Sequence, residues 1–348
     1  MIKINEIHPI DPKNRNKYSK VEHLEKDYIQ KFKVNTQPEI LLNNAIINKK
    51  SREYKITKPI QLKILKYLCD EFDSIIIAKP RDQAKIISKF IRNNWQQEVY
   101  DIYKNAKGVD KQRTSKFGEE ILHLLGYKER FRKNVGRGIW LANQLNIKSC
   151  PYCNANNTII TEKKYGKELL KFQLDHFFPK SEFPYLSISL YNLIPSCANC
   201  NITKSSKPLN LNEDYHPYEM NLASKAKFHL KYDPDPAKLT LYSICKQNLE
   251  IEFIAKHTDP LNIVKKHNEM YHIDGVYNRH QDHAEELLML SIIYSRMQAK
   301  KHLEIKGLFE NEEHYYRFLL RNYHLEKDTL KRPLAKFTQD IRKQLHIK

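Results

Sequence analysis

The sequence predicts a mainly α-helical protein with a small central segment of strands and cysteines, and therefore an α+β fold overall. Apolar residues recur at helical spacing up to about residue 145 and again after about residue 259. Between these regions, β-branched residues, turn residues and cysteines replace the helical pattern. The chain has 348 residues, 41% of them hydrophobic, which is enough for more than one packed domain.

Residues 1–147 are expected to form a helical N-terminal domain. After Pro80, apolar residues at helical spacing predict one buried face of a long helix, formed by Ile87, Ile91, Trp95, Val99 and Ile102. Two further helices are expected at about 117–125 and 128–145.

Residues 148–215 are expected to form a separate central domain, because the composition changes at its start. Residues 158–161 and 169–174 are typical of two strands, and Gly166 suits the turn between them because glycine tolerates positive φ. An irregular loop follows, and a helix is expected to begin near Pro195.

Residues 216–348 are expected to contain short strands and then helices. The strand candidates lie near 227–232, 239–244 and 249–254, and the helices at about 259–272, 277–305, 312–322 and 330–345. The last helix is expected to bury a stripe formed by Leu334, Phe337, Ile341 and Leu345.

The chain is strongly basic, with 60 Lys and Arg against 41 Asp and Glu and a formal charge of +19. Such a charge attracts polyanions, so DNA is the expected partner and RNA the alternative. A second interpretation is that the lysines form ordinary solvated faces. The amino terminus lacks a secretory signal, and no segment has the roughly 18 apolar residues of a membrane helix. We therefore expect a cytoplasmic protein with no membrane partner.

Four of the six cysteines form two CxxC pairs, Cys150 with Cys153 and Cys197 with Cys200. In a reducing compartment this pattern favours a metal over disulfides, and four thiolates complete a tetrahedral zinc site. Such a zinc has no open coordination position, so we expect it to be structural. The isolated Cys69 and Cys245 are expected to be core packing residues.

Polar residues with catalytic chemistry lie between and within the cysteine pairs. They occur in Leu174-Asp175-His176-Phe177-Phe178-Pro179-Lys180, in Tyr191-Asn192-Leu193, and in a CxxCN..K segment that ends with Asn201 and Lys204. This arrangement resembles the HNH endonuclease family, whose signature is an Asp-His pair leaving a hairpin, a following Asn-Leu and a CxxCN..K helix. The resemblance covers about Cys150 to Lys207 and implies a zinc-stapled ββα-metal finger.

The resemblance and the chemistry together imply a role for each residue. Hydrolysis of a phosphodiester needs an activated water and positive charge near the phosphate. His176 is expected to be the general base, because an imidazole with an ordinary pKa near 6.5 is mostly neutral at neutral pH. Asp175 and Asn201 are expected to hold one catalytic Mg²⁺ or Mn²⁺ through oxygen ligands. By resemblance, Asn192 orients the loop that presents the base.

One geometrical difficulty concerns Asp175 and His176, because adjacent residues of a regular strand point to opposite faces. We expect the strand to end near Pro179, so that a departure from ideal pleating brings both groups to one cleft. Lys204 is a candidate phosphate contact, and the alternative is a solvated lysine on an exposed helix face.

Three histidines outside the motif are not expected to bind a metal. His216 suits a turn, whereas His280 and His283 are expected to be surface residues because no cysteine lies near them.

Three functions fit these features. The first is a metal-dependent DNA endonuclease in restriction or anti-phage defence, acting alone, as a homodimer or with a partner protein. The second is a non-catalytic zinc module that binds nucleic acid, and the third is a metal-dependent RNase. Net charge does not separate them, because all three bind nucleic acid.

Overall fold

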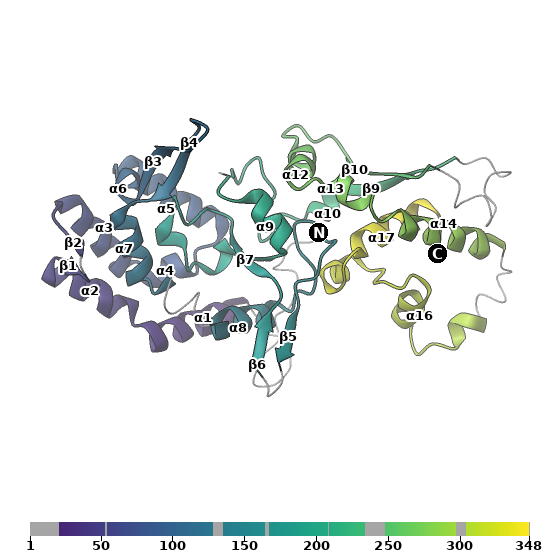
Figure 1. Ribbon diagram of the computed structural model, residues 1–348. Coiled ribbons are helices and arrows are strands. Elements are labelled where there is room, and N and C mark those ends of the chain that lie inside the picture. Colours follow the sequence, from purple (N-terminus) through teal and green to yellow (C-terminus); the bar gives the residue numbers. More distant parts are fainter. Residues whose placement is uncertain are drawn as a thin grey trace. The chain divides into compact units, whose positions relative to one another are not determined.

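The computed structural model shows helices and small sheets of two antiparallel strands, a mixed α+β fold (Figure 1). The structure describes residues 21–52, 54–127, 135–163, 167–207, 209–233, 248–296 and 304–347. The predicted α+β class is confirmed at this level. Within these ranges, no helix combines the length and the apolar character that crossing a membrane requires.

The chain divides into two compact units. The N-terminal unit contains Ile160–Asn212 and the described part of Ile7–Asn146, and the C-terminal unit contains Ile147–Ile159 and the described part of Glu213–Lys348. The contacts therefore separate residues 148–159 from residues 160–212. The expected division into 1–147, 148–215 and 216–348 rests on composition instead of contacts, and it stays a prediction.

Helices form most of the N-terminal unit. They are α1 (Val21–Thr36), α2 (Pro38–Asn48), α3 (Pro59–Asp70), α4 (Phe72–Ile76), α5 (Pro80–Arg92), α6 (Gln96–Val99), α7 (Lys116–Leu124), α8 (Val135–Leu145) and α9 (Ala198–Lys204). Pro38, Pro59 and Pro80 each lie in a first helical turn, where a missing N–H removes no helix hydrogen bond. Helix α7 confirms the one expected at 117–125. Of the helix expected at 128–145, residues 128–134 lie outside the described residues.

The prediction of one long helix after Pro80 is wrong. Helix α5 ends at Arg92, the short α6 follows, and the chain then enters strand β3 (Tyr100–Lys104). Asn94 has a φ of 57°, a left-handed conformation that interrupts a right-handed helix. Because the chain changes direction there, the expected stripe is not one buried face: Val99 is buried, but Ile91 and Ile102 are 58% and 63% exposed.

Each sheet of the N-terminal unit has two antiparallel strands. The pairs are β1 (Lys50–Ser51) with β2 (Tyr54–Lys55), β3 with β4 (Asp110–Thr114), β5 (Ile160–Lys163) with β6 (Lys167–Leu170), and β7 (Gln173–His176) with β8 (Leu193–Ser196). The strand expected over 169–174 is divided by a bend at residues 171–172. As a result β6 and β7 pair with different partners, and the additional strand β8 carries the chain into α9.

The C-terminal unit has one sheet and several helices. Its elements are α10 (Leu222–Lys225), β9 (Ala226–Lys231), β10 (Glu250–Ala255), α12 (Ile263–Tyr271), α13 (Ile273–Tyr277), α14 (Gln281–Arg296), α16 (Glu312–Leu319), a 3₁₀ segment Glu326–Lys331 and α17 (Ala335–Gln344). Phe228 of β9 packs against Phe253, Tyr277 and Phe337 with ring centroids 4.1 to 5.7 Å apart. This aromatic group forms the centre of the unit.

The C-terminal predictions are mostly confirmed. Of the helix expected at 277–305, α14 covers 281–296, and residues 297–303 lie outside the described residues. The strand expected at 239–244 lies outside the described residues. In α17, Phe337 and Ile341 are buried as expected, while the flanking Leu334 and Leu345 are only half-buried.

Candidate active site

A strand–strand–helix unit carries the residues singled out in the sequence. Strand β7 pairs with β8 in the register Asp175↔Ile194 and His176↔Leu193, and α9 follows β8 at once. Cys197 caps α9, because its Sγ accepts a hydrogen bond from the backbone N–H of Cys200. The order β7, β8, α9 is therefore a small ββα arrangement.

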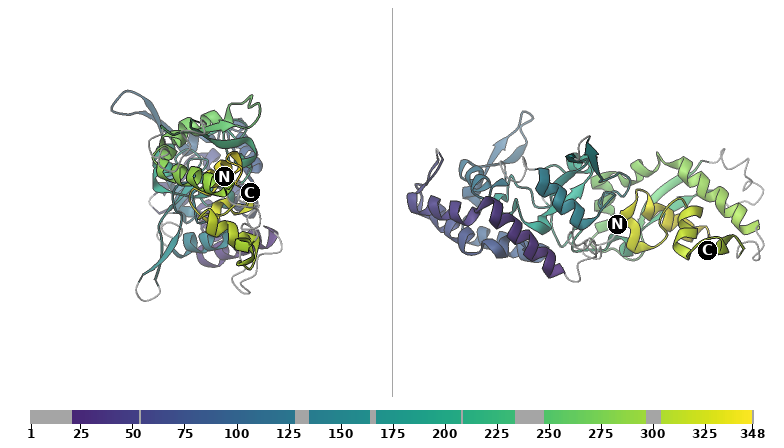
Figure 2. Two further views of the ribbon diagram at one scale, coloured as in Figure 1. Left: turned by 90° about the vertical axis from the view of Figure 1, so that its right-hand side faces the viewer. Right: turned by 90° about the horizontal axis from the view of Figure 1, so that it is seen from below.

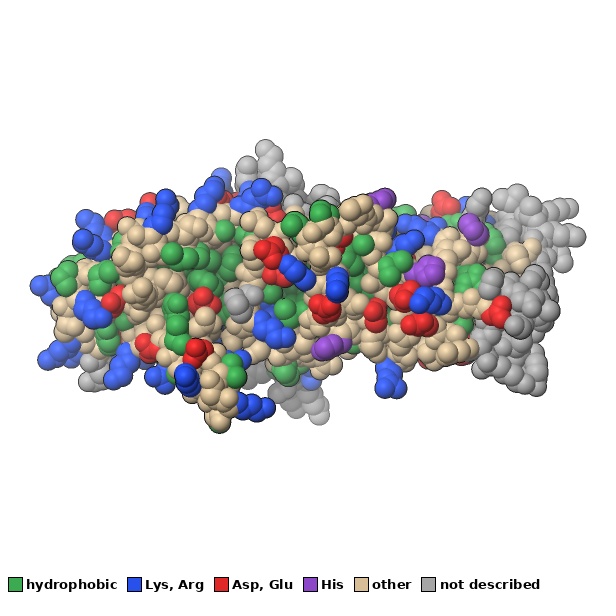
Figure 3. Space-filling view, turned by 90° about the horizontal axis from the view of Figure 1, so that it is seen from above, with side chains coloured by type: hydrophobic (Ala, Val, Ile, Leu, Met, Phe, Trp, Pro, Cys, Tyr) green, Lys and Arg blue, Asp and Glu red, His purple; other side chains and the backbone are tan. Residues whose placement is uncertain are grey.

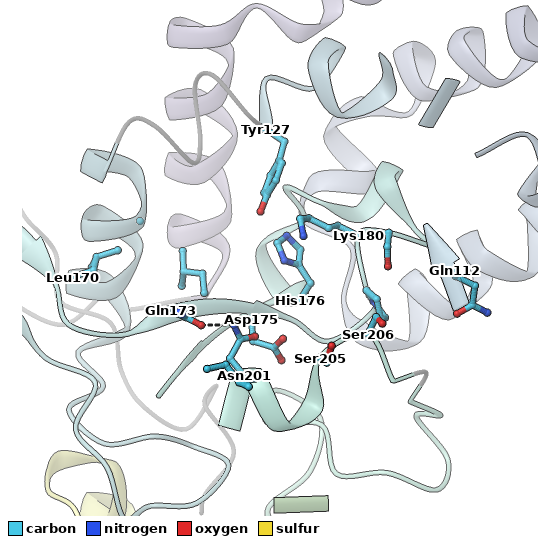
Figure 4. A pocket seen from close by; sticks show the side chains of 15 residues that line it. Gln112, Tyr127, Leu170, Gln173, Asp175, His176, Lys180, Asn201, Ser205 and Ser206 are labelled. Atoms are coloured by element: carbon cyan, nitrogen blue, oxygen red, sulfur yellow. Dashed lines mark hydrogen bonds between the residues drawn. The ribbon is translucent and has the colours of Figure 1, made fainter. Parts of the chain in front are cut away.

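A cavity of about 790 Å³ lies against this unit. Asp175, His176 and Asn201 all line it, so the structure brings the three expected residues to one space. Figure 4 shows the imidazole of His176 pointing toward Tyr127 and Lys180, and the carboxylate of Asp175 pointing toward Asn201. The two neighbouring side chains leave β7 in different directions, as strand geometry requires, and both line the cavity.

His176 is held in one tautomer. Its Nε2 lies 2.8 Å from the carbonyl oxygen of Ser187. A carbonyl only accepts hydrogen bonds, so Nε2 carries the proton and donates, which leaves the lone pair on Nδ1. The ring of Tyr127 packs edge-on against the imidazole with centroids 5.4 Å apart. His176 therefore presents one basic nitrogen in a fixed orientation.

The environment of His176 disfavours its charged form. Burial is the main cause, and the positive charges of Lys180 and Lys204 add to it, so that the pKa of His176 falls to about 3. The imidazole is therefore neutral at physiological pH, as a general base must be.

Asn192 is completely buried and organises the loop before it. Its Oδ1 accepts from the backbone N–H of Phe178, and its Nδ2 donates to the carbonyls of Phe178 and Leu186, at 2.8 to 3.1 Å. Leu186 precedes Ser187, whose carbonyl binds His176. Asn192 thus joins the segment after the base to the segment that fixes the base, and its catalytic contribution as a positioning residue stays a prediction.

Lys204 is buried, so the expectation of a solvated lysine is wrong, and the expected phosphate contact stays a prediction. Its Nζ donates to the carbonyl of His176 at 2.6 Å and to Oδ1 of Asp175 at 3.2 Å, and its side chain has no exposed surface. Burial lowers the pKa of Lys204, and the negative charge of Asp175 opposes that effect. The lysine is therefore not solvated, and in this conformation its ammonium binds α9 to β7 instead of contacting a phosphate.

Replacing Lys204 by methionine is expected to destabilise the N-terminal unit by about 3–5 kcal/mol, because the carboxylate of Asp175 then lacks its buried partner. Lys207→Met, at an exposed residue of the same segment, is the matched control and should change stability by less than about 0.5 kcal/mol. Urea unfolding of both variants measures the difference. Equal stabilities would show that the pair does not hold α9 in place.

Asn201 lies on α9 and faces the same cavity. Its Nδ2 donates to Oε1 of Gln173 on β7. This hydrogen bond orients the amide so that its oxygen is the remaining polar atom. The carboxylate of Asp175 and the amide oxygen of Asn201 are two side-chain oxygen groups of the cavity lining that could serve as ligands to a hard cation.

The four CxxC thiols come together in one buried cluster. The sulfur atoms of Cys150, Cys153, Cys197 and Cys200 all lie within 4.8 Å of one another. The Sγ of Cys153 also accepts a hydrogen bond from the backbone N–H of Ala155 at 3.4 Å, as Cys197 does from Cys200. Such N–H donors stabilise thiolates. The cluster can therefore hold a zinc-type metal. Among the described residues, no second group of three His, Cys, Asp or Glu side chains is placed to do so.

Among the described residues, Cys69, His216, His280 and His283 do not line the cavity. Cys69 is half-buried and its Sγ contacts Asn43, so it is not the core residue expected, and Cys245 lies outside the described residues. The Nδ1 of His216 accepts from the backbone of Tyr218, as suits a turn. His280 and His283 are half-buried instead of exposed, and His283 is hydrogen-bonded to Thr338.

Sequence reasoning missed several residues of the cavity. Tyr127 and Lys180 line it, and the Lys180 ammonium lies 6.0 Å from the Tyr127 ring centroid. Lys180 follows the Asp-His motif closely, so its charge was a usable signal. Tyr127 lies far from the motif, and nothing in its sequence context marks it.

Comparison with known proteins does not extend this picture. Searches against protein-family models, curated proteins and solved structures found no match for the chain. The function is therefore inferred from the residues of the site.

Proposed function

We propose that the chain is a metal-dependent endonuclease of the HNH type that hydrolyses phosphodiester bonds of DNA. The observation that supports this most is a single cavity lined by a neutral imidazole of fixed tautomer and by two oxygen-bearing side chains. The ββα order of β7, β8 and α9 agrees with the signature in the sequence. Proposed with it are a zinc-stapled ββα-metal finger, a cytoplasmic location, and a role in restriction or anti-phage defence.

In this proposal His176 is the general base. Its Nδ1 takes the proton from the attacking water, while the Ser187 carbonyl holds Nε2 and stabilises the imidazolium that forms. A base with a pKa of about 3 is neutral but weak. A phosphodiester entering the cavity brings negative charge close to the ring, which raises this pKa and strengthens the base.

Asp175 and Asn201 are the residues that hold the catalytic cation. A Mg²⁺ ion is bound in proteins by one or two carboxylates and otherwise by water and substrate phosphates, and the single carboxylate here suits that pattern. Such an ion supplies positive charge for the phosphate and the leaving oxygen. The ammonium of Lys204 holds the carboxylate of Asp175 in place, and Lys180 adds positive charge to the cavity wall.

The cysteine cluster is proposed to bind a structural zinc. Four thiolates complete the coordination of this ion and leave no position for a substrate. Its contribution to cleavage is then indirect, since Cys197 and Cys200 fix the start of the helix that carries Asn201.

The nuclease proposal is tested by incubating the purified chain with plasmid DNA and with structured RNA, with Mg²⁺, with Mn²⁺ and with neither. We expect cleavage of plasmid only when a divalent ion is added. His176→Ala protein purified in parallel excludes a contaminating nuclease. Cleavage of RNA alone would replace the DNA assignment by that of an RNase. Binding without cleavage of either would favour a non-catalytic zinc module.

A further inference from the structure

A two-stranded ribbon borders the candidate cavity. Strands β3 and β4 pair from Tyr100↔Thr114 to Lys104↔Asp110, and no other strand among the described residues joins them. Gly108, with a φ of 73°, closes the turn between them. Figure 2 shows in two further views that the ribbon projects from the helices beside it. Near the middle of the ribbon, Gln112 of β4 lines the same cavity as His176.

The register of the ribbon separates its side chains into two faces. Ile102 lies opposite Gln112, and Lys104 lies two residues further along the same strand, so all three share one face, here called the Gln112 face. On the other face, the guanidinium of Arg113 lies over the ring of Tyr103 and 3.7 Å from Asp101. The Gln112 face is therefore the one directed along the cavity wall.

The Gln112 face and the turn beside it combine exposed apolar side chains with charged ones. Ile102 is 63% exposed, and Val109 at the end of the turn is 52% exposed. Lys104, which lies opposite the exposed Asp110 on this face, and the turn residue Lys107 are also exposed. A narrow ribbon gains nothing in stability from apolar side chains directed at solvent, so these residues indicate a contact surface. The ribbon and its turn carry four basic side chains against two acidic ones: Lys104, Lys107, Lys111 and Arg113 against Asp101 and Asp110. This excess of positive charge favours an anionic partner.

Positive charge on the rest of the N-terminal unit is less localised. Figure 3 shows Lys and Arg side chains spread over one face of the N-terminal unit, with acidic side chains among them. A diffuse charge attracts nucleic acid without orienting it. A projecting ribbon that reaches the cavity is better placed to define where a strand lies.

We propose that the Gln112 face of the β3–β4 ribbon contacts duplex DNA next to the cavity and sets the position of the scissile phosphate. This inference rests on the proposed nuclease function. The major groove of B-DNA, about 12 Å wide, accepts a two-stranded ribbon. In this arrangement Lys104 and Lys107 bind phosphates, Ile102 packs against sugar or base edges, and Gln112 lies where the strand enters the cavity.

The test measures DNA affinity in a form of the full chain that does not cut DNA, the His176→Ala protein with no added divalent ion. Binding of a fluorescent duplex of a few helical turns is followed by anisotropy at several salt concentrations. The variants are Lys104→Ala/Lys107→Ala and Ile102→Ser. The matched control, Lys63→Ala/Lys66→Ala on α3, removes the same charge from exposed positions that do not line the cavity. Circular dichroism melting shows that each variant is folded.

The ribbon lysine variant is expected to bind roughly tenfold more weakly and to lower the salt slope of log K by about 2, because two phosphate contacts are lost. Ile102→Ser should weaken binding without changing the slope, since it removes no charge. The α3 control should change affinity by less than about threefold. Equal losses in the ribbon and α3 variants, or tight binding of RNA only, would overturn the proposal.

The result is separable from that of the nuclease assay. Ribbon-dependent binding by a wild-type chain that cleaves nothing supports the contact surface and rejects the nuclease. Cleavage by a chain whose DNA binding does not depend on the ribbon supports the nuclease and rejects the contact surface.

Discussion

His176→Ala is expected to lower the rate of DNA cleavage by about 10²–10⁴-fold while DNA affinity stays nearly unchanged. In the proposed mechanism the His176 imidazole accepts the proton from the attacking water. Its Nε2 donates to the carbonyl of Ser187, so Nδ1 carries the lone pair. Single-turnover cleavage of plasmid at saturating protein measures the rate, and anisotropy measures the affinity. His257→Ala, at an exposed histidine outside the cavity, is the matched control. Similar rates for the two variants would remove His176 from the mechanism.

The burial of His176 also determines how the cleavage rate of the wild-type chain depends on pH. Because the pKa of His176 lies at about 3, its imidazole stays neutral as the pH falls from about 8 to about 5.5. Cleavage at low DNA concentration should therefore show no inflection near 6.5, where an exposed histidine protonates. The unfolded chain does bind that proton, so the contribution of His176 to stability is lost as pH falls from about 6.5 toward 3. An inflection in the rate near 6.5 would mean that the base is solvated.

Cys197→Ser is expected to abolish zinc binding and to lower the melting temperature by roughly 10 °C or more. A structural zinc contributes several kcal/mol to the free energy of folding, and about 1 kcal/mol corresponds to a change of 2–4 °C in the melting temperature of a domain of this size. Cleavage should fall with it, since Cys197 caps the helix that presents Asn201. The metal content of the purified protein and a thermal melt measure both effects.

Cys69→Ser is the control for the cysteine substitution, because this half-buried thiol lies outside the cluster. It should keep about one zinc per chain and melt within about 2 °C of the wild type. Zinc content that is unaffected by Cys197→Ser would show that the cluster does not bind the metal.

Much of the metal cluster was predictable from the sequence. Two CxxC pairs constrain their thiols locally, so a fold that brings the pairs together makes four ligands converge. The position of Asn201 followed from helix periodicity, because α9 begins directly after Cys197 and places Asn201 one residue beyond Cys200. The presence of Asp175 and His176 at a strand end was predictable in the same way.

Other features depend on tertiary contacts that no local pattern encodes. Lys204 has the spacing of an exposed helix residue, yet it reaches back to Asp175 on a strand that lies 29 residues earlier. The break at Asn94 cannot be seen from apolar spacing, because the residues after it continue the same period by chance. Strand β8 was missed because its four buried residues include Pro195, which argues against a strand in isolation.

The most direct test of the central claim is a crystal structure of the His176→Ala protein with duplex DNA and Mn²⁺, in which the anomalous signal locates the ion. We expect one Mn²⁺ in contact with Asp175, Asn201 and a phosphate of the DNA inside the cavity. DNA bound away from the cavity, or Asp175 paired with Lys204 alone and no Mn²⁺ beside it, would contradict the account.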